Sequence, residues 1–234
     1  MKNKRQPIFR MLRHALFGKP EVRFFGRDRL DEKLLAYLPE LNGFFVELGA
    51  NDGVSQSNTL HFEKFRGWRG VLVEPTPHNY LACRENRSAQ NHIFCNACTS
   101  FDYKERFVEI VYSNLMSAPV GLESDLEDPV AHAESGKVFL SEHEDIFTFG
   151  ALARPLNDLL IQADAPRRID LLSLDVEGAE LEVLKGIDHN IFRFRFMCIE
   201  TRSPDAVRAF CEEKGYQLVE KISDLDYLYF DSNG

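Results

Sequence analysis

The feature that most limits the fold of this chain is a series of short apolar runs that alternate with helical patterns. Each run is nearly continuous in apolar residues, as is typical of strands covered on both faces. The runs are Phe44 to Leu48, Gly70 to Glu74, His92 to Ala97, Ile169 to Leu174 and Phe196 to Glu200. Helical patterns occupy Ser57 to Phe65, His78 to Asn86, the stretch EGAELEVLKG and Pro204 to Lys214. These repeated strand–helix units predict an α/β fold with a doubly wound, mostly parallel sheet.

The end of the chain departs from the parallel pattern. Two further apolar runs, Tyr216 to Ile222 and Leu225 to Phe230, are joined only by Ser223 and Asp224. A parallel return needs a crossover of about a dozen residues or more, so these two strands must be antiparallel. We therefore expect one reversed strand near an edge of the sheet.

A second departure lies between the third and fourth strands. Phe107 to Phe149 opens with a strand-like stretch, FVEIVYS, and then becomes acidic and irregular. We interpret residues from about 113 to 149 as an acidic insertion in the domain. Long connections of this kind serve as lids or binding loops, or are plain solvated insertions, and the sequence leaves both alternatives open.

The first part of the chain is basic, although the whole chain carries a formal net charge of -9. Met1 to Arg29 holds nine Lys or Arg residues and two acidic ones, with apolar residues at roughly helical spacing between them. We predict a basic helical arm over residues 1–42 and a single domain over residues 43–234. The arm is either a solvated terminus or a contact with an anionic partner, for which we favour a membrane surface over nucleic acid.

Membrane and redox signals point to a cytoplasmic protein. No signal peptide is expected, because Arg10 and Arg13 interrupt any apolar stretch, and no apolar run approaches the ~18 residues of a membrane span. The number of cysteines is odd and their spacing is not that of a disulfide framework, which favours a reducing compartment. They are Cys83, Cys95, Cys98, Cys198 and Cys211. We expect Cys95 and Cys98, a lone CxxC pair, to be small core residues rather than a zinc or redox site.

Candidate ligand residues follow the strands, because open parallel sheets bind ligands beyond the carboxyl ends of their strands. The first strand runs into LGANDG, whose glycine turn resembles a nucleotide site, but Glu47 and Asp52 would repel a pyrophosphate. A ligand with a cation and a ribose, such as S-adenosylmethionine, would be attracted instead. Glu74, at the end of the second strand, is placed to bind the ribose diol.

Four stretches of the sequence together resemble the FkbM-type methyltransferases. They are VELGANDG, GWRGVLVEPTPHNY, IDLLSLDVEGAELEVLKG and CIET, and the resemblance runs from about Gly43 to Phe230. It implies an S-adenosylmethionine-dependent methyltransferase with a Rossmann-like class I methyltransferase fold and a seven-stranded sheet. Some proteins that resemble this branch of the superfamily are not enzymes, so the family alone does not imply catalysis.

The resemblance also implies roles for individual residues. Glu74 would hold the ribose, the Asn96–Ala97 corner would lie near the adenine, and Asp175, Glu177 and Gly178 would face the methyl group and the acceptor. The methionine side of the cofactor would be lined by Glu47, Gly49, Asn51, Asp52 and Gly53. Many members carry Lys where this chain has Ser173, so any charge pairing by that lysine is absent here.

Methyl transfer to a hydroxyl requires alignment of donor and acceptor and removal of the hydroxyl proton. Carboxylates after the fourth and fifth strands are the candidate bases, with two histidines as weaker ones. The candidates are Asp175, Glu177, Glu200, His61 and His143. The three carboxylates form an alternative Mg²⁺ site, which we do not favour. We expect Glu180 to lie on a solvated helix face and His61 to be packed in the first helix.

The sequence therefore predicts an O-methyltransferase that acts on a hydroxyl of a sugar or glycan precursor. The sugar acceptor rests on the family resemblance alone. Two alternatives remain: a non-catalytic binding or adaptor module with the same fold, and a nicotinamide-dependent oxidoreductase, which Glu47 and Asp52 disfavour.

Overall fold

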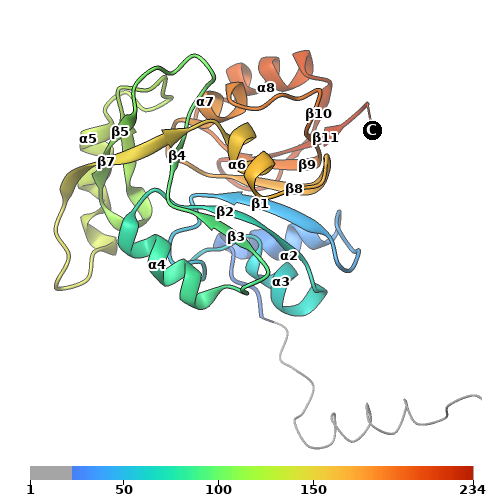
Figure 1. The fold of residues 1–234 in the computed structure, drawn as a ribbon, viewed down its shortest axis with the longest axis horizontal. Coiled ribbons are helices and arrows are strands. Elements are labelled where there is room, and N and C mark those ends of the chain that lie inside the picture. The colour runs from blue at the N-terminus through green and yellow to red at the C-terminus, as the bar shows by residue number, and fades with distance from the viewer. Residues whose placement is uncertain (1–22, 234) are drawn as a thin grey trace, which may run out of the picture.

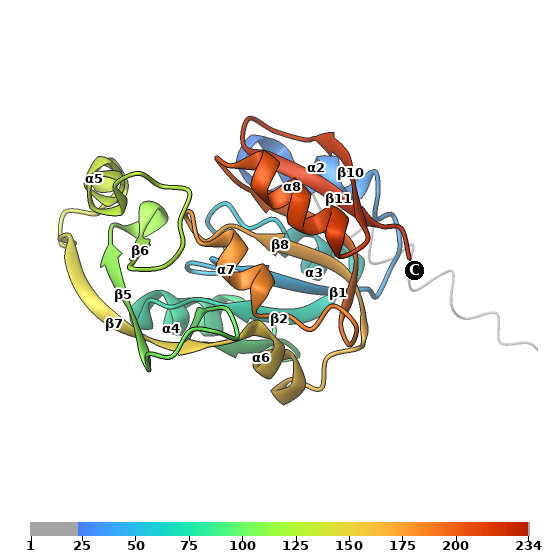
Figure 2. The same cartoon turned by 90° about the horizontal axis from the view of Figure 1, so that it is seen from above.

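The computed structural model of the protein describes residues 23–233 and contains a seven-stranded and a four-stranded sheet. Figure 1 shows the larger sheet at the centre of the molecule, and Figure 2 shows the smaller sheet beside one end of it. The strand order of the larger sheet is β10-β11-β9-β8-β1-β2-β3. Its strands are β1 (Phe44–Leu48), β2 (Arg69–Val73), β3 (His92–Phe94), β8 (Arg168–Leu174), β9 (Arg193–Glu200), β10 (Tyr216–Lys221) and β11 (Asp226–Asp231).

The larger sheet confirms the expected topology. Strands β1, β2, β3, β8 and β9 pair in parallel, and the order reverses at β1, which pairs with both β2 and β8. Strand β11 runs antiparallel to both β9 and β10, so the reversed strand lies one position from the edge. This is the doubly wound, Rossmann-like class I arrangement.

Helices cover both faces of this sheet (Figure 1). On one face, α6 (Leu156–Gln162), α7 (Glu180–Lys185) and α8 (Pro204–Glu213) pack in a core cluster that includes Leu160, Leu184 and Val207. The cluster on the other face contains Phe62 of α3 (Leu60–Arg66) and Cys83 of α4 (Pro77–Asn86). It also contains Leu30 and Leu34 of α2 (Leu30–Leu35). The strands between the two clusters are thus covered on both sides, as their continuous apolar runs predict.

The smaller sheet was not predicted beyond its first strand in the insertion. Its order is β4-β7-β5-β6, and its strands are β4 (Ala97–Cys98), β5 (Phe107–Tyr112), β6 (Ala118–Val120) and β7 (Phe147–Arg154). Between β5 and β7 the chain also forms two short 3-10 turns, Asn114–Met116 and Gly136–Phe139, and helix α5 (Pro129–Ser135). The segment is therefore a folded layer with its own small core of Val108, Ile110 and Ala151.

The third apolar run was wrongly predicted as one strand. The structure ends β3 at Phe94 and assigns Ala97 to the other sheet, where it pairs with Ala153. The intervening Asn96 donates its side-chain amide to the backbone oxygen of Leu152 at 3.0 Å. This hydrogen bond holds the chain where it passes from one sheet to the other.

Residues 1–22 of the predicted basic helical arm lie outside the described residues. From residue 23 onward, the chain leads into α2, whose Leu30 and Leu34 pack beside Phe45 and Trp68. Within residues 23–233, no helix combines the length and apolarity that crossing a membrane requires. The five cysteines are free thiols, and all except Cys95 are buried.

Candidate functional site

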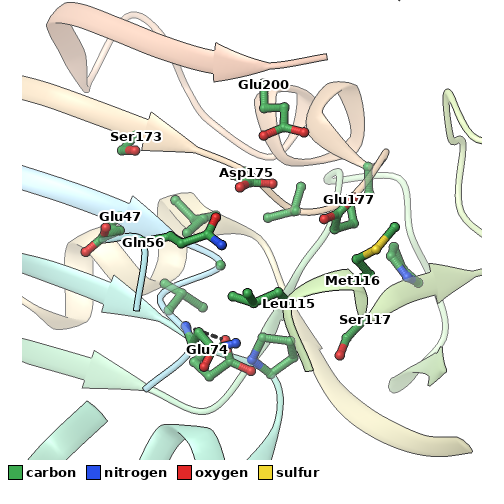
Figure 3. A pocket seen from close by; sticks show the side chains of 18 of the residues that line it. Glu47, Gln56, Glu74, Leu115, Met116, Ser117, Ser173, Asp175, Glu177 and Glu200 are labelled. Carbon is green, nitrogen blue, oxygen red and sulfur yellow. Dashed lines mark hydrogen bonds between the residues drawn. The ribbon is translucent and has the colours of Figure 1, made fainter. Parts of the chain in front are cut away.

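A cavity of about 450 Å³ lies beyond the carboxyl ends of β1, β2, β8 and β9, where the small sheet meets the large one. Figure 3 shows its side chains converging from the strand ends and from the insertion. The predicted site residues that line it are Glu47, Gly49, Asn51, Glu74, Asn96, Ala97, Asp175, Glu177 and Glu200. A cavity of this size lies within the range of small-molecule sites.

The turn after β1 is shaped by close contact with β8. Gly49 has a φ of 76°, and a side-chain carbon there would lie 1.9 Å from the backbone oxygen of Asp175. Gly53 has a φ of 78°, and a side-chain carbon there would meet Arg87 at 2.8 Å. Glycine at position 49 lets the ends of β1 and β8 approach this closely, which brings Asp175 against the turn of residues 49–53.

Glu47 is buried, and its charge is compensated within the fold. Its carboxylate lies 3.0 Å from Arg87 Nη1 and accepts hydrogen bonds from the Ser57 hydroxyl, the Asn58 amide and the Thr59 hydroxyl. Arg87 also pairs with Glu63 at 2.7 Å. The charge of Glu47, which we expected to attract the ligand, therefore contributes much less to the electrostatic field in the cavity than an unpaired carboxylate would.

Asp52 and Gly53 are not among the residues that line the cavity. The Asp52 carboxylate instead accepts the backbone N–H groups of Val54 at 2.8 Å and Ser55 at 2.7 Å. This is the local hydrogen bonding by which Asp stabilises a turn. This turn also positions Asn51, which has a φ of 46° and lines the cavity.

Glu74 presents a different carboxylate. It follows β2, is 5% exposed, and accepts the backbone N–H of Asn51 at 2.9 Å on one oxygen and that of Thr76 at 2.8 Å on the other. Burial raises the pKa of Glu74, and these two hydrogen bonds oppose that shift. A carboxylate has about four lone-pair sites, so each oxygen can accept one further donor from the cavity.

Asp175 and Glu200 form a second acidic group, after β8 and β9. Burial, followed by the nearby charges of Glu200 and Glu177, raises the pKa of Asp175 well above its usual range. Burial and the charges of Glu177 and Asp226 raise the pKa of Glu200 to about 7. A carboxyl group that titrates near neutrality is suited to proton transfer.

Glu177 is held by two partners from other segments. It adopts a left-handed conformation with a φ of 52°, and its Oε2 lies 2.8 Å from His132 Nε2 and 3.1 Å from Arg202 Nη2. His132 belongs to α5 in the insertion, and Arg202 follows β9. Glu177 therefore joins three segments at the cavity. The carboxylate of Asp175, in contrast, accepts no hydrogen bond from any of residues 23–233.

The insertion contributes residues to the cavity that were not predicted from the sequence. Asn114, Leu115 and Met116 line the cavity from the 3-10 turn after β5, and Asn114 accepts a hydrogen bond from Asn51 Nδ2 at 3.2 Å. The turn has no repeating apolar pattern that would assign it to the cavity. Its one local sequence feature is Asn114, a residue type that tolerates the left-handed φ of 53° found there. The site is thus built from both sheets.

Other predicted residues have structural roles. The prediction that Glu180 lies on a solvated helix face is wrong: it is 2% exposed and accepts the N–H groups of Val176 and Gly178, both at 3.1 Å. His61 is buried and stacked on Phe24, which confirms that it is packed. His143 is exposed and Ser173 is buried.

No metal-binding arrangement was found in the part of the chain that the structure describes. Within residues 23–233, no group of three or more His, Cys, Asp or Glu side chains is placed to hold a metal ion. The alternative Mg²⁺ set of Asp175, Glu177 and Glu200 does not meet that condition. Burial raises the pKa of Cys98, the second residue of the CxxC pair, to about 12.

Known methyltransferases are similar to this chain in sequence. Residues 47–218 match the Methyltransferase FkbM domain. A curated relative, the methyltransferase sdnD of Sordaria araneosa, is 48% identical over 56 residues, which is 22% of this chain and 22% of that protein.

Solved methyltransferase structures are also similar to this chain. A human methyltransferase 10 domain containing protein has a TM-score of 0.47 at 12% identity, with 96% of this chain and 93% of that chain covered. The precorrin-6y C5,15-methyltransferase of Geobacter metallireducens has a TM-score of 0.42 at 10% identity, with 91% and 92% covered.

Proposed function

The chain belongs to the FkbM methyltransferase domain family, and from that premise we propose that it methylates a hydroxyl group of a sugar or glycan precursor with S-adenosylmethionine. Family membership confirms the resemblance seen in the four sequence stretches. The observation that carries the cofactor proposal is the carboxylate of Glu74, buried at the end of β2 with acceptor capacity left toward the cavity.

The residues around the cavity suit this cofactor. Glu74 would accept hydrogen bonds from both ribose hydroxyls, Asn96 and Ala97 would border the adenine, and the turn with Gly49 and Asn51 would lie along the methionine part. We assign these roles because all five residues line one cavity. When bound, the cofactor supplies an electrophilic methyl group on a positively charged sulfur.

The acidic group beyond β8 and β9 would handle the proton of the acceptor. We assign Asp175 and Glu200 as the pair that accepts the hydroxyl proton while a carbon–oxygen bond forms and the carbon–sulfur bond breaks. Glu177, held by His132 and Arg202, would fix the shape of the acceptor side. Positioning of this kind supplies much of the rate enhancement in transfers between two substrates.

The first experiment measures the affinity for the cofactor. Calorimetry with the full chain should give tighter binding of S-adenosylhomocysteine than of NAD. Glu74→Ala should weaken S-adenosylhomocysteine binding by about 1.5 to 3 kcal/mol, because two hydrogen bonds to an ionised group are lost. Asp52→Asn is the matched control: it keeps an acceptor oxygen for the turn, and we expect its affinity to change by less than about threefold.

Unchanged affinity in Glu74→Ala would place the ribose elsewhere, and tighter binding of NAD would overturn the methyltransferase assignment in favour of an oxidoreductase.

The second experiment is turnover, measured as S-adenosylhomocysteine formed with a panel of hydroxylated acceptors. Cofactor binding without turnover on any of them would favour a non-catalytic module.

The compartment belongs to the same proposal. Five free cysteines, four of them buried, support a protein that works in the reducing cytoplasm.

A further inference from the structure

The insertion lines the cavity with apolar side chains beside the polar Asn114 and Ser117, and these face the acidic residues after the strands. Met116 and Phe139 line it from the two 3-10 turns of the insertion. Figure 3 shows Met116 next to Glu177, across the cavity from Glu47 and Ser173. Phe139 is 43% exposed although it borders the cavity, so the apolar surface continues outward from the cavity to its rim.

Both side chains are positioned by the fold. A side-chain carbon at Gly136 would lie 2.7 Å from Cβ of Met116, so the second 3-10 turn packs directly against the first. Asn114 donates its side-chain amide to the backbone oxygen of Phe139 at 3.3 Å. Met116 and Phe139 are thus held together as one wall, which we call the apolar wall.

The strand side of the same cavity disfavours negatively charged ligands. The carboxyl groups that line it, Glu47, Glu74, Asp175, Glu177 and Glu200, outnumber the two arginines, Arg27 and Arg202. Arg202 lies 3.8 Å from Glu200 and is shared with Glu177. The excess of carboxyl groups over cations disfavours an anionic acceptor, even where Asp175 and Glu200 hold protons. A free, fully polar sugar would not cover the apolar wall. The wall would stay in contact with water, and its burial would contribute nothing to the free energy of binding.

We propose that the acceptor is an uncharged glycoside, whose sugar hydroxyl faces Asp175 and Glu200 and whose apolar aglycone lies on the apolar wall of Met116 and Phe139. This inference rests on the proposed function, because the same cavity must also take the cofactor. It narrows the acceptor from any sugar or glycan precursor to one with an apolar substituent next to the methylated sugar.

The test is a binding measurement on the full chain saturated with S-adenosylhomocysteine. The probes are octyl β-D-glucopyranoside, methyl β-D-glucopyranoside and the anionic octyl β-D-glucuronide, each below its micelle concentration. The octyl glucoside should bind at least about tenfold more tightly than the methyl glucoside, which corresponds to burial of roughly two methylene groups. The glucuronide should bind more weakly than the octyl glucoside.

Two variants test the wall itself. Met116→Gln and Phe139→Ser should each reduce the octyl-to-methyl preference at least about threefold, each measured at saturating S-adenosylhomocysteine for that variant, so that a change in cofactor affinity does not enter the comparison. Val138→Gln is the matched control, because Val138 is 80% exposed beside Phe139 and does not line the cavity, so its preference should equal that of the wild type.

The outcomes separate this inference from the proposed function. S-adenosylhomocysteine binding with no octyl preference, or with a preference that both wall variants retain, would overturn the inference alone. Tighter binding of the glucuronide would overturn the assignment of an uncharged acceptor. Failure to bind S-adenosylhomocysteine at all would overturn the proposed function, and the inference with it.

Discussion

Two glutamates on neighbouring strands show how much environment decides the role of a residue. Glu47 in β1 is paired with Arg87 and surrounded by hydroxyl donors, whereas Glu74 after β2 is held by two backbone N–H groups. The sequence places both at the ligand but does not reveal that Arg87, 40 residues further on, reaches back to Glu47. The acidic character that favours a cationic cofactor is therefore assigned mainly to Glu74, Asp175 and Glu200.

Glu180 gives a prediction for stability against pH. Burial raises the pKa of its carboxyl to about 8 from an ordinary 4.5, so the folded protein holds a proton that the unfolded chain releases. The stability that this proton contributes is complete below pH 4.5 and is lost as the pH rises through about 8. Glu180→Gln keeps an oxygen for the N–H groups of Val176 and Gly178 and cannot ionise.

The free energy of unfolding of the wild type should therefore fall more steeply between pH 5 and 8.5 than that of Glu180→Gln. The difference should be on the order of 1 kcal/mol or more, since one pKa unit corresponds to about 1.4 kcal/mol. Urea denaturation at a series of pH values measures it. Asp175 and Glu200 titrate in both proteins, and Glu180→Gln also removes a charge that raises the pKa of Asp175. The difference between the curves therefore reports Glu180 together with this coupling, and parallel curves would refute the raised pKa of Glu180.

At the scale of elements, Asp125 ties the insertion to the main domain. Its Oδ2 accepts hydrogen bonds from the Thr201 hydroxyl at 2.9 Å and from the backbone N–H groups of Arg202 at 2.6 Å and Ser203 at 3.1 Å. These donors precede α8, whose N-terminal end also attracts negative charge. The loop after β9 and the insertion are thus fixed to each other beside the cavity.

Asp125→Ala should lower the free energy of unfolding by about 2 to 3 kcal/mol, because three donors lose one charged acceptor. Asp125→Asn is the matched variant: it keeps one acceptor oxygen for the three donors and replaces the charged carboxylate by a neutral amide, so its loss should stay below about 1 kcal/mol. Urea denaturation compares the two. Equal losses in both variants would mean that the charge, rather than the acceptor geometry, holds the insertion.

The elements that the sequence predicted correctly are those with a repeating pattern. The parallel strands and the final hairpin follow from continuous apolar runs and from the short Ser223–Asp224 link. The small sheet could not be predicted, because its pairing depends on contacts between distant segments, such as Phe107 with Leu152 and Ala97 with Ala153. Likewise, Met116 has no local pattern that would assign it to the cavity.

At the scale of the whole molecule, the cavity lies between the two sheets, and each sheet supplies one side of it. The large sheet supplies the strand ends with Glu74 and Asp175, and the small sheet with its 3-10 turns supplies the facing side (Figure 2). Asn114 connects the two parts, because it accepts a hydrogen bond from Asn51 at 3.2 Å and donates one to the backbone oxygen of Phe139 at 3.3 Å. Ligand binding at residues 49–53 should therefore also reduce the local opening of residues 136–140 in the insertion.

Hydrogen–deuterium exchange can measure that connection. S-adenosylhomocysteine should slow exchange at residues 49–53 and also at residues 136–140, and leave the β10–β11 hairpin unchanged, because a bound ligand suppresses local opening of the segments it holds. Asn114→Gly removes both hydrogen bonds and accommodates the φ of 53°. In this variant the protection at 49–53 should persist and that at 136–140 should fall to the level of the free protein. Equal protection at 136–140 in both proteins would mean that the two sheets respond to the ligand independently of Asn114.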